Sequence, residues 1–292
     1  MTLAIHDAHG AFANGLSRRT STEIDQLLLA GRRPASNDPV GQDNAGDRQH
    51  RQRHYTREFH AQVAKSRTAE QPFLNGRHLA ERLRYPRGFL DRLPLHLVDT
   101  FIGLGNPFSM GAPLVGAVVV DVGCGAGFDA LVSGHHVGSS GLVFGVDITK
   151  EMVQRASKAA AEIEFQHVHF IEGTSEELPL AGNIADLVTS NGVFNLGDRE
   201  QAIAECHRVL KPGGRLQFAD AVWGPDLPHA DLPSSLLLRS AQSNRLTCQD
   251  WRELLTSVGL VDVEVGPESN PYRDDTLPGH HRPRVIAATK PT

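Results

Sequence analysis

The chain has 292 residues, of which 40% are hydrophobic and 22% are charged, and its formal net charge is −5. That balance is typical of a soluble globular protein with one large core, and it lacks the strongly basic character of a nucleic-acid-binding domain. No apolar run approaches the roughly 20 residues that span a bilayer, so we expect a cytoplasmic protein without nucleic-acid or membrane partners.

The first 53 residues differ in composition from the rest of the chain. Residues 32–53 are rich in polar residues, glycine and proline, with almost no apolar side chain to bury, which predicts disorder. One short helix is expected earlier, where Ser21 caps an apolar run that ends at Leu28. We therefore predict that residues 1–53 form a disordered extension that ligand binding does not require.

The next segment, residues 54–110, has the pattern of short amphipathic helices. Leucine and phenylalanine recur at helical spacing up to residue 98, and Pro86 and Pro94 interrupt the pattern. A glycine-rich turn at 103–107 then leads into the main domain. We expect residues 54–110 and 223–247 to form a lid over a small-molecule ligand, because their aromatic side chains suit an apolar or mixed pocket.

From residue 111 to 292, segments typical of buried strands alternate with helical segments. Seven strands are predicted, at 117–122, 142–146, 168–172, 185–190, 215–220, 261–265 and 284–289. Helices are predicted between them at 128–137, 149–161, 200–210 and 248–258. This alternation implies a doubly wound α/β fold, with a mostly parallel sheet and helices on both faces. The last two strands have no helix between them, so we expect an antiparallel pair at one edge.

Three alternating glycines, Gly123, Gly125 and Gly127, lie between the first predicted strand and the helix that follows it. Glycine lets the backbone turn sharply there and approach a ligand at the carboxyl ends of the strands. The spacing is G-x-G-x-G, not the G-x-G-x-x-G that cradles a dinucleotide pyrophosphate. The carboxylate just ahead of the loop, Asp121, suits the ammonium group of an amino acid better than a pyrophosphate.

A second carboxylate, Asp147, ends the second predicted strand. At that position it can accept hydrogen bonds from both ribose hydroxyls of an adenosine. The loop and the two acids therefore predict an adenosine ligand that carries an amino acid. In the alternative interpretation, the glycines only make a tight turn and the acids are solvated, but the coincidence of both acids with the strand order disfavours it.

Six segments of residues 103–220 resemble, in order, those of class I S-adenosylmethionine-dependent methyltransferases. They are GLGNPF (103–108), VVVDVGCGAGFDALV (118–132), VGSSGLVFGVDITKEMVQRA (137–156), IEGTSEELPL (171–180), ADLVTSNGVFNL (185–196) and RVLKPGGRLQFAD (208–220). The likeness is to the arsenite methyltransferase-like branch of the larger family that includes ubiquinone-biosynthesis methyltransferases. It implies a Rossmann-like fold and methyl transfer from S-adenosylmethionine to a small-molecule acceptor by in-line displacement.

The resemblance also implies which residues hold the cofactor. Asp121, Gly123 and Gly125 would line its methionine portion, and Gly127 would help form the turn. Asp147 would hold the ribose.

The adenine and the methyl group are assigned in the same way. Ile148 and Met152 would pack on the adenine, while Ser190 and Asn191 would lie near the sulfonium and the transferable methyl. The backbone positions that would read the polar edge of the adenine are Thr174 and Ser175.

The sequence identifies no general base, which is needed only if the nucleophile must lose a proton. Asn191 and Tyr55 are the candidate catalytic residues, Tyr55 because helices that precede the domain often cover the acceptor pocket in related enzymes. His167 and His169 alternate on a predicted strand and could form half of a metal site, but no third ligand has supporting spacing. We therefore expect no metal, and the sequence leaves the oligomeric state open.

The chain departs from the arsenite methyltransferases where those enzymes present cysteine thiols to the arsenic. Leu104, Gly192 and Phe194 occupy the corresponding positions, and soft thiolates are the ligands that suit such an acceptor. The chain has three cysteines, Cys124, Cys206 and Cys248, and no two of them are close in the sequence. They support neither a disulfide framework nor a zinc site. The absence of cysteines at the arsenic-binding positions makes arsenite methylation an alternative function and not the main prediction. Binding of S-adenosylmethionine without catalysis is the other alternative.

Overall fold

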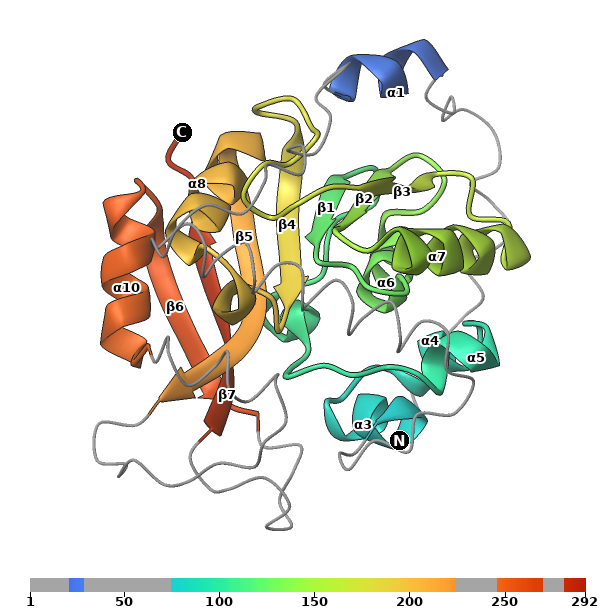
Figure 1. Ribbon diagram of the computed structural model, residues 1–292, viewed down its shortest axis with the longest axis horizontal. Helices are drawn as coiled ribbons and strands as arrows, with labels where there is room; N and C mark the ends of the chain where they lie inside the picture. Colours follow the sequence, from blue (N-terminus) through green and yellow to red (C-terminus); the bar gives the residue numbers. More distant parts are fainter. Residues whose placement is uncertain (1–20, 29–74, 224–245, 270–280) are drawn as a thin grey trace, which may run out of the picture.

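A seven-stranded sheet forms the centre of the computed structural model, which describes residues 21–28, 75–223, 246–269 and 281–292 (Figure 1). The strand order is β3-β2-β1-β4-β5-β7-β6. The strands are β1 (Val118–Val122), β2 (Leu142–Asp147), β3 (Val168–Glu172), β4 (Ala185–Asn191), β5 (Leu210–Trp223), β6 (Val261–Glu268) and β7 (His281–Thr289). β1 to β5 are parallel, and β7 runs antiparallel to both β5 and β6. The predicted mostly parallel, doubly wound sheet with an antiparallel pair at one edge is confirmed.

The strand order reverses direction between β1 and β4. After β1 the chain builds outward to β2 and β3, and it then returns to place β4 on the other side of β1. Loops that leave the carboxyl ends of β1 and β4 therefore diverge, and ligands of open α/β sheets bind in the crevice at such a switch point.

Each face of the sheet carries its own apolar core. α8 (Arg199–Val209) and α10 (Cys248–Ser257) cover one face, where Trp251 is completely buried against Phe218. α6 (Phe128–Val137) and α7 (Lys150–Glu162) cover the other face. The continuous burial of β1 and the nearly continuous burial of β2 follow from this coverage on both sides.

Three short helices form a further layer outside α6: α3 (Gly76–Arg82), α4 (Arg87–Leu90) and α5 (Leu95–Val98). Phe101, which follows them, stacks on Phe128 of α6 with ring centroids 3.9 Å apart. The 3₁₀ helix η1 (Pro107–Met110) then leads toward β1. The described part of the predicted lid is thus packed against α6, whereas residues 54–74 and 224–245 lie outside the described residues, so the covering of an acceptor stays a prediction.

The short helix predicted within the N-terminal extension is present as α1 (Ser21–Leu27). Ser21 is its first residue, and Ile24, Leu27 and Leu28 pack against the core. The backbone N–H of Ala181 donates to the carbonyl of Leu27 at 2.9 Å, just before β4 begins. α1 is therefore attached at the amino end of β4, at the sheet edge opposite the carboxyl ends (Figure 1). The rest of residues 1–53 lies outside the described residues.

Three strands are longer than their apolar patterns predict: β5, β7 and also β6, which continues to Glu268. β5 begins at Leu210, which pairs with Ala185, and it continues to Trp223, which pairs with His281 of β7. Glycine or proline near the ends of β5, β6 and β7 conceals these extensions, because both residues usually end a strand. In the four described ranges, no helix combines the length and the apolar character needed to cross a membrane.

Candidate functional site

The carboxyl ends of β1, β2 and β4 bring together most of the predicted site residues. β1 pairs with β2 on one side and with β4 on the other, so that Val122 lies beside both Val146 and Ser190. Asp121 is the next-to-last residue of β1, Asp147 is the last residue of β2, and Asn191 is the last residue of β4. Residues separated by up to 70 positions in the sequence therefore share one edge of the sheet.

The glycine loop has two packed glycines and one that faces open space. All three have positive φ angles: 68° at Gly123, 52° at Gly125 and 95° at Gly127. A Cβ atom on Gly123 would lie 2.3 Å from Cγ2 of Val193, and one on Gly127 would lie 2.8 Å from the Phe170 ring. A Cβ atom on Gly125 would meet no atom within 4 Å. The backbone at Gly125 is therefore the point at which a ligand can approach the loop.

Asp147 organises the segments around it. Its Oδ2 accepts a hydrogen bond from the backbone N–H of Gly125 at 2.9 Å, and its Oδ1 accepts one from Thr149 at 2.8 Å. These bonds fix the glycine loop and the start of α7 relative to β2. Each carboxylate oxygen can accept a second bond, so the half-buried Asp147 retains capacity for two ligand hydroxyls.

Asp121 is a buried carboxylate that is only partly hydrogen-bonded, with 2% of its surface exposed. Its Oδ1 accepts a bond from the Thr189 hydroxyl at 2.9 Å, whereas its Oδ2 is buried without a hydrogen bond of ordinary geometry. Burial, and next the charge of Asp129, raise the pKa of Asp121 well above its usual value, while the Thr189 hydroxyl lowers it. An uncompensated buried acid of this kind favours a cationic partner.

Asp129, in the first turn of α6, is a residue that the sequence analysis missed. Its Oδ1 accepts a bond from the Tyr85 hydroxyl at 2.5 Å, and its Oδ2 accepts one from Nδ2 of Asn191 at 3.0 Å. Burial raises the pKa of Asp129 to about 6, and the hydrogen bonds from Tyr85 and Asn191 oppose that rise. The available signal was an acidic residue two positions after the last loop glycine, where the start of a helix stabilises a negative charge.

The side chain of Asn191 is used in holding neighbouring segments. Its Oδ1 accepts from the backbone N–H of Leu104 at 2.8 Å, and its Nδ2 donates to the carbonyl of Gly105 at 2.9 Å as well as to Asp129. Ser190 is buried, and its hydroxyl donates to the carbonyl of Val122. Asn191 therefore positions the turn at 103–105 against β4, while the other catalytic candidate, Tyr55, lies outside the described residues.

The residues predicted to surround an adenine lie beside Asp147. The N–H of Gly173 donates to the carbonyl of Asp147 at 3.0 Å, which places Thr174 and Ser175 next to the end of β2. Both are half-buried, and the Ser175 hydroxyl donates to Glu176. The two apolar candidates are near the start of α7: a half-buried Ile148 and a buried Met152.

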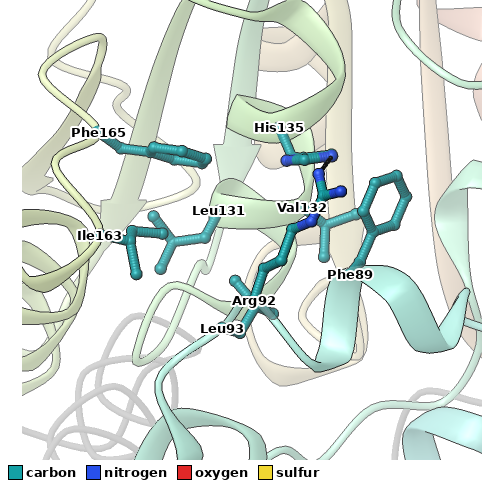
Figure 2. A pocket seen from close by; sticks show the side chains of 8 residues that line it. All are labelled: Phe89, Arg92, Leu93, Leu131, Val132, His135, Ile163 and Phe165. Carbon is teal, nitrogen blue, oxygen red and sulfur yellow. Dashed lines mark hydrogen bonds between the residues drawn. The ribbon is translucent and has the colours of Figure 1, made fainter. Parts of the chain in front are cut away.

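A groove of about 310 Å³ lies elsewhere, between α4, α6 and the turn from α7 to β3 (Figure 2). Its lining is mostly apolar, with Arg92 and His135 in contact at 3.0 Å on one side. None of the predicted site residues lines this groove, so the carboxyl ends of the strands remain the candidate site. Within the part of the chain that the structure describes, no three His, Cys, Asp or Glu side chains are grouped to hold a metal ion.

Comparison with known proteins gives a family match over the central part of the chain. Residues 114–259 match a family model described as a methyltransferase domain. The arsenite methyltransferase of Halobacterium salinarum is 34% identical over 171 residues, which cover 58% of this chain and 44% of that protein. The demethylmenaquinone methyltransferase of Listeria monocytogenes is 34% identical over 114 residues, 39% of this chain and 48% of that protein. The chain spans about half the length of these curated relatives.

A solved structure supports the same relationship. The arsenic(III) S-adenosylmethionine methyltransferase from Chlamydomonas reinhardtii superposes with a TM-score of 0.52 at 27% sequence identity. The similarity covers 75% of each chain. The Rossmann-like architecture is therefore shared beyond the segment that matches the family model.

Proposed function

The chain belongs to the family of methyltransferase domains, and on that premise we propose that it transfers a methyl group from S-adenosylmethionine to a small-molecule acceptor. One observation supports this most: Asp121 and Asp147 lie at the carboxyl ends of adjacent strands, and the open Gly125 position lies in the loop that follows β1. A buried carboxylate with a free oxygen suits an ammonium group, and a carboxylate with spare acceptor capacity suits a ribose. The residues present therefore fit this cofactor.

We propose a division of roles along the edge of the sheet. Asp121 holds the amino acid end, and Asp147 holds the ribose while keeping Gly125 in place. Ile148 and Met152 pack on the adenine, and the backbone at 174–175 reads its polar edge. Ser190 and Asn191 lie toward the transferable methyl group.

The cofactor supplies an electrophilic methyl group on a positively charged sulfur, so the protein mainly has to align the reactants and exclude water. Alignment of two reactants contributes up to about 7–11 kcal/mol. Asn191 serves this purpose by fixing the turn at 103–105 against β4, since its amide accepts and donates hydrogen bonds without titrating. None of the described residues is assigned as a general base.

We propose that the acceptor is held between the carboxyl ends of the strands and a lid from residues 54–110 and 223–247. The protein would act in the cytoplasm, where thiols stay reduced, and its three cysteines are free. Fractionation of cells that express the tagged chain tests that location.

Arsenite methylation is the alternative that the names of two relatives favour. Burial raises the pKa of Cys124 and of Cys206, which keeps both thiols protonated and makes them poor ligands for arsenic. Cys124 follows β1, whereas Cys206 lies in α8 and Cys248 begins α10, on the opposite face of the sheet. We therefore propose a different small-molecule acceptor. Arsenite-dependent turnover that disappears when all three cysteines are replaced by serine would contradict this.

Incubation with methyl-labelled S-adenosylmethionine and a cell extract tests the proposed function. We expect a labelled small molecule with the wild-type chain and a large loss of labelling with Asp147→Ala. Tight binding without labelled product in any extract would instead favour a protein that binds the cofactor without catalysis.

A further inference from the structure

Two buried carboxylates near the glycine loop have unequal hydrogen bonding. Asp129 has 6% of its surface exposed and accepts hydrogen bonds from Tyr85 and Asn191 through its two oxygens. Asp121 is more deeply buried and accepts one, from Thr189. The other oxygen of Asp121 has no hydrogen bond of ordinary geometry, although the N–H of Ala130 lies near enough to lower its pKa slightly.

Two negative charges cannot both be accommodated cheaply in such a buried place, so the pair titrates as a unit. The two donors on Asp129 stabilise its charged form, whereas Asp121 has one donor of ordinary geometry and faces the charges of Asp129 and Asp147. These neighbours lie on α6 and β2 and have the same sign, and Tyr85, whose pKa burial raises well above its usual value, stays neutral. This difference in hydrogen bonding favours Asp121 over Asp129 as the carrier of the proton.

We propose that Asp121 is protonated in the ligand-free protein and releases that proton when the ammonium group of the ligand docks against it. This inference rests on the proposed function, because it takes the amino acid end of the cofactor as the docking group. The O–H bond of the Asp121 carboxyl group breaks and its proton passes to the solvent, after which the carboxylate accepts a hydrogen bond from an N–H of the ammonium group. One positive charge replaces another, so the charge of the buried site is unchanged.

Asp129 becomes a specificity-determining residue in this scheme, although it need not touch the ligand. Its charge makes ionised Asp121 costly unless a cation is present, so the site favours a ligand with a cationic amino acid end. An adenosine ligand without the ammonium group, such as 5′-methylthioadenosine, has no reason to displace the proton.

Calorimetric titration of the full chain with S-adenosylhomocysteine, in buffers of different ionisation enthalpy, measures the protons released. We expect release of up to about one proton per ligand near pH 7, decreasing as the pH rises above the pKa of Asp121. Titration with 5′-methylthioadenosine should release none. Binding of S-adenosylhomocysteine without proton release between pH 6 and 7.5 would overturn the inference but leave the proposed function standing, whereas absence of any binding would contradict the proposed function itself.

Two substitutions with opposite effects locate the proton. Asp129→Asn removes the neighbouring charge and should shift the release profile to lower pH. Thr189→Val is nearly isosteric, removes the donor to Asp121, and should shift the profile to higher pH. Titration of the ligand's own amine is common to all the proteins, so the differences report on Asp121. Profiles that do not move in either variant would place the proton elsewhere, and Thr189→Val alone decides the matter if Asp129→Asn does not fold.

Discussion

Replacing the loop glycines one at a time by alanine should separate stability from ligand binding. Alanine at Gly123 has to adopt a φ of 68°, which costs about 1–2 kcal/mol. Its Cβ would also lie 2.3 Å from Cγ2 of Val193, and such overpacking adds about 1–3 kcal/mol. We therefore expect Gly123→Ala to lower the free energy of unfolding by about 2–5 kcal/mol.

Gly125→Ala is the matched comparison. The backbone strain is similar at a φ of 52°, but the new Cβ meets no atom of the protein within 4 Å. The loss of stability should therefore be only about 1–2 kcal/mol. The added methyl group occupies the space through which the ligand approaches, so the Kd for S-adenosylhomocysteine should rise at least about tenfold, or about 1.4 kcal/mol.

Urea denaturation gives the stabilities, and calorimetry gives the Kd values. Val193→Ala removes the two Cγ atoms that crowd position 123, so it should recover part of the stability lost in Gly123→Ala through a coupling of about 0.5–3 kcal/mol. Equal destabilisation by Gly123→Ala and Gly125→Ala, or wild-type affinity in Gly125→Ala, would refute this account of the loop.

Further predictions concern the acids and the N-terminal helix. Asp147→Ala removes two charge-assisted hydrogen bonds along with the ribose contact, and we expect the Kd for S-adenosylhomocysteine to rise about 10–100-fold by calorimetry. Burial raises the pKa of Asp220 from 3.8 to about 6, so the folded protein binds more protons than the unfolded chain between these values. Stability should fall as the pH rises through that window, by up to about 3 kcal/mol from this group, and urea denaturation at pH 4.5 and 7.5 should show a smaller fall in Asp220→Asn. Removal of residues 1–53 exposes the core surface under α1, so thermal unfolding should occur at a lower temperature while ligand affinity stays within about twofold; a total loss of binding would show that the extension belongs to the site.

The site residues at the carboxyl ends of the strands could be predicted from the sequence, because their positions depend on local patterns. A buried apolar run that carries an acid at or next to its last position, as at Asp121 and Asp147, places that acid at the carboxyl edge of a parallel sheet. The same holds for Ser190 and Asn191 at the end of β4. Glycine at the three loop positions permits the positive φ angles found there, but residue type alone does not fix them.

The partners of these residues could not be predicted, because they come from distant segments. The buried Asp129 accepts a hydrogen bond from Tyr85, which lies 44 positions away in the sequence, and no periodicity encodes that contact. Val193 explains why Gly123 must be glycine, but only the fold places the two together. The contact of α1 with Ala181 was likewise hidden, since it depends on a few apolar side chains in a polar segment. The sequence therefore predicts where a ligand can bind more readily than the network that tunes the site.

An experimental structure of the chain with S-adenosylhomocysteine tests the central claim most directly. The account predicts both ribose hydroxyls within hydrogen-bond distance of the Asp147 carboxylate. It also predicts the ammonium group in contact with the Asp121 carboxylate and the ligand in contact with the backbone of Gly125. Density for the ligand in the groove between α4 and α6, or at the strand ends with neither carboxylate in contact, would contradict it.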